Sequence, residues 1–414
     1  MIRFHIRSLG CKVSQYDGEK LAEKLCLLGM ESVEENPDVF ILNGCSVTSR
    51  ASQKARQIMR SVKRANPKVK IVLAGCEARL SERNNAIVEN IDWVMTHNDD
   101  ESIKRMLSAL SLDVPEVNFK VSYNKAITEK TRAYLKIQDG CTQFCTYCIV
   151  SRLRGPEWSR PIADAVNEAQ LLADEGHKEI VLTGIHIGHF KPSLIPLLSE
   201  LDKISKIERI RLSSIEPTEV DDALIDWAAS SPKACHHFHL PLQSGCDKIL
   251  KAMNRPYYTE DFRNVVKKIR AKIPNVAITT DLIVGFPGET EQDFADTLNF
   301  LKEINFSRIH IFKFSPREGT PAATMPNQVD NGEKTKRSDL VQAIWHESAK
   351  EFHSKFLDQK LEVLWETSEE GYFSGFSKEY VPCKLPDNGQ KLENTITTAI
   401  GLKATADHLT VEAI

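Results

Sequence analysis

The sequence predicts an α/β protein in three parts: an N-terminal doubly wound parallel sheet, a central partial (β/α)6 barrel and a small C-terminal β-barrel. Three observations predict this fold. Three strand-like runs near the N-terminus each end in Gly-Cys, six further runs alternate with helical patterns, and short alternating segments follow residue 352. At 414 residues the chain is too long for one core. We expect domains at residues 1–115, 131–350 and 351–414, and a linker at about 111–130.

The N-terminal strands are expected at residues 2–9, 39–42 and 71–74, with helices at 17–28 and 49–65. The second and third runs are continuously apolar, which is typical of strands buried on both faces of a parallel sheet. In open parallel sheets, ligands bind beyond the carboxyl ends of the strands. We therefore expect Cys11, Cys45 and Cys76 to converge on one rim and to hold an iron–sulfur cluster with one open iron. Three separate buried cysteines are the alternative.

The glycine before each of these cysteines fits that expectation, because glycine lets the backbone turn sharply and approach a bulky ligand. The other cysteines lack this pattern. Cys26 lies on the apolar stripe of a predicted helix and is expected to pack in the core. Cys235, Cys246 and Cys383 have no ligand-like neighbours in the sequence, and no role is assigned to them.

The loop after the first central strand carries the most specific signal in the chain. Residues 139–148 read Asp-Gly-Cys-Thr-Gln-Phe-Cys-Thr-Tyr-Cys and place Cys141, Cys145 and Cys148 in a CxxxCxxC spacing. Three thiolates this close can hold one iron–sulfur cluster and leave one iron free for chemistry. A zinc site would need a fourth ligand, and the spare candidates, His177 and His186, are a whole helix away in sequence. A partial zinc knuckle or a redox-active cysteine pair is the alternative.

The central part shows six β/α units, which imply an incomplete parallel barrel. Strands are expected at residues 134–138, 180–183, 210–213, 237–240, 278–284 and 309–314, with helices such as 164–173, 261–271 and 291–301. Active sites of parallel barrels lie at the C-terminal ends of the strands. Small, polar and glycine residues at those ends suit a backbone wrapped around a ligand. From them and the cysteine loop we expect these cofactor contacts: Tyr147, Thr183, Gly184, Ser213, Glu216, Gln243 and Gly285.

Two features of the central and C-terminal parts have two interpretations each. The histidines at 236, 237 and 239 are expected to pack in the barrel or to contact substrate, because no further metal ligand is evident. Residues 361–365, 371–376 and 409–413 predict the C-terminal β-barrel. Aromatic and lysine side chains exposed on that barrel would bind single-stranded RNA, or else the aromatics form its core: Trp365, Tyr372, Phe373 and Phe376.

The composition narrows the class of protein. The net charge of −3 excludes a uniformly cationic nucleic-acid binder, but the run from Arg50 to Lys70 contains eight basic residues and no acidic residue. That run suits phosphate contacts, and a solvated helix face explains it equally well. No apolar run spans a bilayer, and the N-terminus lacks a signal-peptide core. We expect a cytoplasmic protein, in which ten cysteines indicate metal binding or catalysis rather than disulfides.

The aromatic residue before the third loop cysteine, Tyr147, makes the CxxxCxxC pattern resemble the radical S-adenosylmethionine (radical SAM) superfamily. Nearly the whole chain resembles its methylthiotransferases. The resemblance implies a C-terminal TRAM domain, two SAM molecules per product and two 4Fe–4S clusters. Cys141, Cys145 and Cys148 would hold the cluster that cleaves SAM to a radical. Cys11, Cys45 and Cys76 would hold an auxiliary cluster whose sulfur receives the methyl group.

Two segments indicate the substrate. Residues 10–16, Gly-Cys-Lys-Val-Ser-Gln-Tyr, and residues 134–141, Tyr-Leu-Lys-Ile-Gln-Asp-Gly-Cys, are most similar to the methylthiotransferases of N6-threonylcarbamoyladenosine. The resemblance implies methylthiolation of C2 of this nucleoside at position 37, in the anticodon stem-loop of tRNA. The isopentenyladenosine subgroup tends to read Gly-Cys-Gln-Met after the first strand, and the ribosomal-protein subgroup Gly-Cys-Pro-Lys. Residues 149–152, Ile-Val-Ser-Arg, depart from the proline and aromatic of many relatives in a loop expected near the substrate.

The alternatives are therefore the same reaction on isopentenyladenosine or on a ribosomal protein. An alternative of another class is a non-catalytic RNA-binding protein stabilised by metal. The family reaction implies a reducing partner such as flavodoxin or ferredoxin. Because a radical removes the hydrogen, no pair of acid and base side chains is required, and we assign no catalytic side chain.

Overall fold

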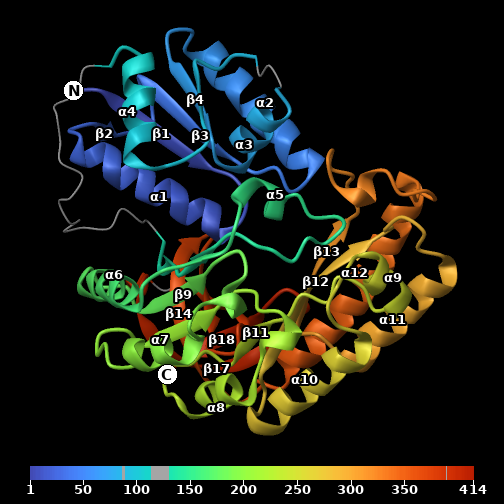
Figure 1. The fold of residues 1–414 in the computed structure, drawn as a ribbon. Coiled ribbons are helices and arrows are strands. Elements are labelled where there is room, and N and C mark those ends of the chain that lie inside the picture. The colour runs from blue at the N-terminus through green and yellow to red at the C-terminus, as the bar shows by residue number, and fades with distance from the viewer. Residues whose placement is uncertain (86–88, 113–129, 388) are drawn as a thin grey trace.

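The computed structural model describes residues 1–85, 89–112, 130–387 and 389–414, so most of the expected linker at 111–130 lies outside the described residues. Figure 1 shows the N-terminal sheet above the central barrel, with the C-terminal strands among the lower elements. The three-part α/β fold class predicted from the sequence is confirmed. No helix in the described ranges is long and apolar enough to cross a membrane.

The N-terminal domain is a five-stranded parallel sheet in the order β2-β1-β3-β4-β5. Its strands are β1 (Arg3–Ser8), β2 (Glu31–Ser32), β3 (Val39–Gly44), β4 (Lys70–Ala74) and β5 (Trp93–Met95). Val39 and Ile41 of β3 face a core shared with α1 (Lys12–Leu27) and α4 (Asp100–Ala109). Phe40 and Leu42 face the opposite core, shared with α2 (Ser49–Ala65) and α3 (Gly75–Arg83). Burial on both faces explains the continuous apolar runs.

Helix α1 begins earlier than the sequence predicted. Its first residue is Lys12 rather than Asp17, because Cys11 takes the extended conformation of an N-cap residue. Val13 and Tyr16 are buried on the inner face of this first turn and a half. The first auxiliary cysteine therefore stands at the beginning of a helix.

The central domain contains the six predicted parallel strands. They are β6 (Arg132–Lys136), β9 (Glu179–Thr183), β10 (Arg209–Leu212), β11 (His237–His239), β12 (Ala277–Val284) and β13 (Arg308–Lys313). Two three-stranded sheets, β10-β9-β6 and β11-β12-β13, are joined by parallel bridges from Ile210 to Ala234 and from Ser214 to His239. The covering helices are α6 (Ile162–Asp174), α7 (Leu194–Leu201), α8 (Asp222–Ser230), α10 (Thr259–Lys272), α11 (Glu291–Ile304) and α12 (Asn331–Ser354).

His237 and His239 pack inside this barrel, which agrees with the interpretation of the histidine run as barrel packing. His237 Nε2 and His239 Nδ1 lie 2.8 and 2.9 Å from the Thr279 hydroxyl. The His237 ring also stacks on Tyr380 of the C-terminal domain, with 4.3 Å between the ring centroids. Burial lowers the pKa of His237 well below its ordinary value, so the ring is neutral and acts in packing.

The C-terminal domain is a closed five-stranded barrel in the order β14-β15-β16-β18-β17. Its strands are β14 (Lys360–Glu369), β15 (Tyr372–Ser377), β16 (Pro382–Pro386), β17 (Ile396–Ala404) and β18 (Leu409–Ala413). The sequence analysis did not predict β16 or β17. Trp365 and Phe373 are core residues, whereas Tyr372 is 42% exposed beside the Lys384 ammonium. Phe376 is half-buried and stacks on Tyr380. Trp365 and Phe373 therefore fit the interpretation as core residues, and Tyr372 is exposed, as the interpretation as an RNA-binding surface requires.

Buried charges attach this barrel to the central domain at the end opposite the cysteine loop. Arg209 and Arg211 of β10 donate to backbone carbonyls of Glu362, Phe376, Ser377 and Lys378. Glu179, the first residue of β9, accepts from Arg211 at 2.6 Å. All three charged side chains are at most 2% exposed. The C-terminal barrel therefore covers the N-terminal ends of the central strands.

We expect Arg211→Met to lower the free energy of unfolding by about 3–5 kcal/mol, because it removes the nearest cation from the buried carboxylate of Glu179. Burial opposes ionisation of Glu179, but Arg211 and Arg132 outweigh it, so its pKa is lowered. The stabilisation is thus present above about pH 4.3 and is lost as the pH falls. Urea unfolding at several pH values measures this.

The matched control for this prediction is Lys206→Met, which removes an exposed ion pair with Asp174 and should change the urea midpoint very little. The double variant Arg211→Met with Glu179→Leu should recover part of the loss, since it leaves no unpaired carboxylate. Equal midpoints for Arg211→Met and the wild type would contradict the proposed role of this ion cluster.

Candidate metal centres

The three N-terminal cysteines converge, as predicted. Cys11 caps α1, Cys45 follows β3 directly, and Cys76 is the second residue of α3. Gly10 has φ +107°, and a Cβ at this position would lie 2.7 Å from the Cβ of Cys45 and 2.9 Å from its Sγ. A side chain at residue 10 would therefore separate the loops of Cys11 and Cys45. Gly75, with φ +77°, packs as tightly against the Asn43 side chain beside Cys76.

The surroundings of this N-terminal triad fit a soft metal cluster. Burial raises the pKa of Cys45 to about 11, with the thiols of Cys76 and Cys11 close enough to raise it further. Iron binding would therefore have to displace the protons of these thiols. The hydroxyl of Ser46 is fully buried and has no hydrogen-bond partner among the described residues. Three thiols with an unused buried donor beside them suit an iron–sulfur cluster better than a closed hydrophobic core.

The second triad lies in the loop between β7 (Gln138–Asp139) and α5 (Val150–Arg154). Phe144 takes a left-handed conformation with φ +52°, which closes the loop between Cys141 and Cys145. The Cys148 amide donates to the Cys145 carbonyl at 3.0 Å. Thr146 fixes the loop to the end of α9 (Asp247–Ala252), because its hydroxyl donates to the Ala252 carbonyl at 2.9 Å.

One buried arginine supports this loop. Arg255 Nη1 donates to Cys145 Sγ at 3.1 Å, and Nε donates to the Tyr257 hydroxyl at 3.1 Å. Its other nitrogen pairs with Glu216, and the Tyr147 hydroxyl is 3.5 Å from Nη1. The guanidinium side chain is only 3% exposed. Arg255 therefore connects Cys145 with Tyr147 and Glu216, two residues that the sequence analysis proposed as cofactor contacts. No pattern in the sequence pointed to Arg255 itself.

His186 is nearer to the loop than its place in the sequence suggested, which corrects the expectation that it lies a whole helix away. Its Nδ1 is 3.6 Å from Cys141 Sγ, because β6 and β9 are neighbouring parallel strands. Burial disfavours the charged ring, but Cys141 and Glu219 outweigh burial and raise the pKa of His186 to about 10. His177, the other candidate, lies at the opposite end of β6, with Nδ1 3.3 Å from the Thr131 carbonyl.

His186 also belongs to a cluster of possible ligands at the barrel mouth. Its ring stacks on His189 with 3.8 Å between centroids. One carboxylate, Glu219, faces the Nε2 atoms of both rings, and Glu157 lies 2.9 Å from His189 Nδ1. Glu219 Oε2 is buried without a hydrogen-bond partner in the described chain. An unused acceptor of this kind suits a polar, cationic ligand bound beside the cysteine loop.

The predicted cofactor contacts lie at the C-terminal ends of the central strands, but not all face one space. Thr183 ends β9 and is buried, and the half-buried Gly184 after it lies beside Gln138. Ser213 is buried, and its hydroxyl has no partner among the residues described. Gly285 has φ +71° and faces Lys334 of α12, so it lies apart from the others. Gln243, with φ +65°, borders a cavity together with Tyr147.

That cavity, of about 180 Å³, is bordered by segments next to both triads. Val47 and Thr48 approach it from the loop after Cys45, and Cys148, Ile149 and Val150 approach it from the second triad. Strand ends of the central barrel complete its walls with Gln243, Asp281, Ile283, Phe312, Lys313, Phe314 and Ser315. Residues 149 and 150, which depart from the pattern of many relatives, therefore border the same space as the loop after Cys45.

A second, larger cleft of about 550 Å³ opens beside the basic helix α2. Arg56 and Arg60 of α2 line it and are 48% and 59% exposed. Arg317 enters from the central domain, donates to the Ser52 hydroxyl at 2.9 Å and is 8% exposed. Glu77 and Glu89 balance part of this charge, at 3.9 Å from Arg56 and 3.5 Å from Arg60.

Two family models match the two domains that carry the cysteine triads. The Radical SAM superfamily matches residues 135–301, and the Uncharacterized protein family UPF0004 matches residues 3–96. The superfamily match implies SAM and a 4Fe–4S cluster as cofactors of the central domain. The radical S-adenosylmethionine methyltransferase TsrM of Kitasatospora setae shares the fold, with a TM-score of 0.57 at 13% identity over 78% of this chain and 77% of its own.

Full-length relatives are more similar in sequence. The threonylcarbamoyladenosine tRNA methylthiotransferase MtaB of Bacillus subtilis is 38% identical over 403 residues, which cover 92% of this chain and 89% of the relative. The tRNA-2-methylthio-N(6)-dimethylallyladenosine synthase of Acetivibrio thermocellus is 36% identical over 87% of this chain and 80% of its own. The chain therefore belongs to the radical SAM methylthiotransferase family.

Proposed function

We propose that this enzyme methylthiolates C2 of N6-threonylcarbamoyladenosine at position 37 of tRNA, with two SAM molecules and two 4Fe–4S clusters. The observation that carries the proposal is the cavity bordered by Cys148 of the second triad and by Val47 and Thr48, which follow Cys45 of the N-terminal triad in the sequence. A carbon held there lies between the proposed radical source at Cys141, Cys145 and Cys148 and the proposed sulfur source at Cys11, Cys45 and Cys76. The bound cofactors supply the radical, the methyl group and the sulfur.

The residues around the cavity supply binding and orientation. Its volume is below the ~300–1,000 Å³ of pockets for drug-sized ligands, which suits one planar base with the rest of the RNA outside. Val47 is 48% exposed and Phe312 is 42% exposed at its border. An exposed aromatic ring can stack on a base that has been turned out of the anticodon loop. Ile283 and Phe314 are the buried side chains of the barrel-side wall and would shield the reacting carbon from water.

The nucleoside can be identified directly. We expect tRNA treated with the reconstituted enzyme, SAM and a reductant to yield methylthiolated threonylcarbamoyladenosine after digestion and mass spectrometry. Methylthiolated isopentenyladenosine instead would favour the second candidate, which is supported by relatives named for dimethylallyladenosine. Unchanged tRNA nucleosides together with a modified ribosomal protein would contradict both. For the electron donor we propose a flavodoxin or ferredoxin of the cytoplasm.

We further propose that the cleft beside α2 holds phosphates of the tRNA backbone. Replacing Arg56 and Arg60 by glutamine should weaken tRNA binding and reduce the slope of log K against log[salt] by about 0.7–0.9 for each phosphate that the variant no longer neutralises. Binding of an anticodon stem-loop at several salt concentrations measures this. Arg105→Gln on α4, on the other face of the sheet, is the matched control. Equal slopes for the double variant and the control would leave α2 as a solvated face.

A further inference from the structure

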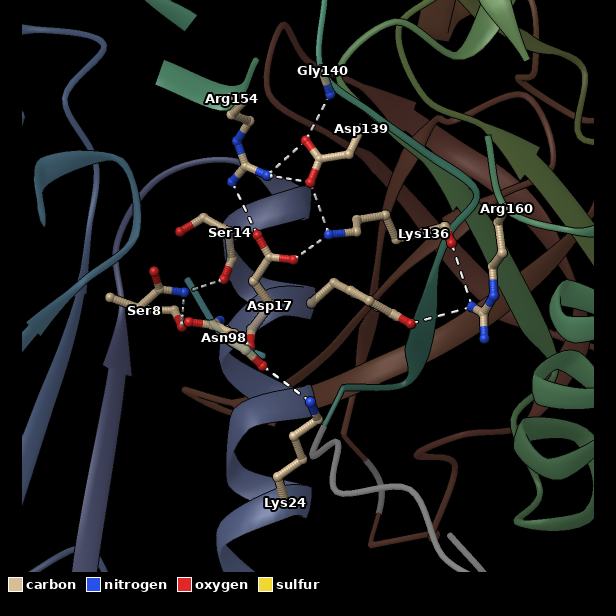
Figure 2. A network of polar contacts seen from close by, with 12 residues as sticks. Ser8, Ser14, Asp17, Lys24, Asn98, Lys136, Asp139, Gly140, Arg154 and Arg160 are labelled. Carbon is tan, nitrogen blue, oxygen red and sulfur yellow. Dashed lines mark hydrogen bonds and ion pairs between the residues drawn. The ribbon is translucent and has the colours of Figure 1, made fainter. Parts of the chain in front are cut away.

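Arg154, at the end of α5, lies where the two cysteine triads approach each other. Its Nη1 donates to both carboxylate oxygens of Asp139, at 3.0 and 2.9 Å. Its Nη2 donates to Asp17 of α1 at 3.0 Å. Figure 2 shows Arg154 and Lys136 on opposite sides of these two carboxylates, each bonded to both. The arginine therefore joins a helix of the N-terminal domain to a strand of the central domain.

Both carboxylates lie close in sequence to a cluster cysteine. Asp139 is two residues before Cys141 and also accepts the Gly140 amide proton at 2.8 Å. Asp17 is on the helix that Cys11 caps. Lys136 adds a second cation, 3.0 Å from Asp139 and bonded to Asp17 at 2.5 Å. Two cations and two carboxylates thus form a neutral network that is largely buried and lies across the domain boundary.

The residue before Arg154 packs against the N-terminal triad itself. Leu153 and Ile149 share a small buried core with Cys76. The Arg154 side chain is 2% exposed, and its Nε has no hydrogen-bond partner in the described part of the chain. A buried cation with a spare donor is thus held beside the segment that packs on Cys76.

We propose that Arg154 is a positioning residue with two effects: it fixes the N-terminal triad relative to the CxxxCxxC loop, and it raises the reduction potential of the N-terminal cluster. The proposal rests on the two-cluster function proposed above. A fixed cation and N–H donors beside a cluster favour its reduced, more negative state. Fixed spacing matters because a radical must meet its target carbon and the sulfur donor in one geometry.

The first test measures the potential of the N-terminal cluster alone, in a chain with Cys141, Cys145 and Cys148 replaced by alanine. A dithionite titration with redox mediators, followed by electron paramagnetic resonance, gives this potential without tRNA or turnover. We expect Arg154→Gln to lower the one-electron reduction equilibrium about tenfold, or about 59 mV. Arg154→Lys keeps the charge and should stay nearer to the wild type.

The second test measures coupling in the two-cluster enzyme, as methylthiolated nucleoside formed per 5′-deoxyadenosine released. Arg154→Gln, Arg154→Lys and Asp17→Asn should each lower this ratio severalfold. The first two lose the three bonds of the guanidinium to Asp17 and Asp139, and the third removes one of the two carboxylates. Asp17→Asn should leave the potential nearly unchanged. Arg160→Gln is the matched control, since Arg160 also joins α1 to the central domain, through Tyr16 at 3.2 Å, but contacts no cysteine. It should change neither the ratio nor the potential.

These readouts separate this proposal from the proposed function. If the wild type makes no methylthiolated nucleoside, the function fails, while the potential still tests Arg154. Wild-type potential and wild-type ratio in Arg154→Gln would overturn the proposal. If the Arg154→Gln enzyme loses its iron, the Arg154→Lys and Asp17→Asn enzymes provide the test. Wild-type ratios of methylthiolated nucleoside to 5′-deoxyadenosine in both of them would overturn the proposal.

Discussion

Replacing Cys148 by alanine should lower the release of 5′-deoxyadenosine from SAM more than about 100-fold, beyond the 10–100-fold typical of an outer-shell partner. Cys148 shares a compact loop with Cys141 and Cys145, and the loop amide and carbonyl groups hold the three thiols together. Loss of one thiolate leaves two protein ligands for a cluster that needs three. The measurement is anaerobic turnover with dithionite, with 5′-deoxyadenosine quantified by chromatography.

Cys26→Ala is the control for this experiment. Cys26 is a half-buried cysteine that packs beside the core of the N-terminal sheet, away from both triads. Its replacement should leave iron content and SAM cleavage unchanged. Release of 5′-deoxyadenosine at the wild-type rate by the Cys148→Ala enzyme would show that the radical chemistry does not depend on this triad.

The triple variant Cys11→Ala, Cys45→Ala, Cys76→Ala should retain SAM cleavage within about tenfold of the wild type, as expected when only surroundings change. Yet its yield of methylthiolated nucleoside should fall more than about 100-fold. The reason is that these cysteines lie in a separate domain, at the ends of β1 and β3 and the start of α3. Among the described residues, this domain contacts the CxxxCxxC loop and the helix after it through the cavity walls, the packing of Cys76 against Ile149 and Leu153, and the Arg154 network.

Iron content, 5′-deoxyadenosine and modified nucleoside should be measured in one reaction of this triple variant. About half of the iron should be lost if two clusters of equal size are present. Methylthiolated product at the wild-type yield would place sulfur transfer elsewhere and leave the N-terminal triad with a structural role. Loss of SAM cleavage as well would mean that the two domains cannot hold their clusters independently.

The sequence alone was sufficient to predict the features that repeat along the chain or recur at a regular spacing. Gly-Cys after each strand predicted the convergence of Cys11, Cys45 and Cys76, because parallel strands bring their carboxyl ends to one rim. The continuous apolar runs predicted strands buried on both faces. The alternation of strands and helices predicted the six central strands, all of which the structure contains.

Other features depend on contacts between distant segments and have no local signal. Arg154 and Arg255 are ordinary arginines in the sequence, and only the fold buries them against Cys76 and Cys145. His186 was judged by its separation along the chain, whereas strand pairing places it beside Cys141. Strand β16 begins and ends in proline, which is typical of a turn until neighbouring strands close the barrel around it.

The attachment of the C-terminal barrel bears on the order in which the chain folds as it is synthesised. Arg209, Arg211 and Glu179 are made well before β14 and β15, whose carbonyls the two arginines bind. Until those strands emerge from the ribosome, water must solvate the three charges, so the end of the central barrel stays open. Release of that water and capture of the carbonyls would then complete the central domain. Ribosome-bound chains that stop before residue 360 should therefore be more sensitive to protease than chains that include the last strands.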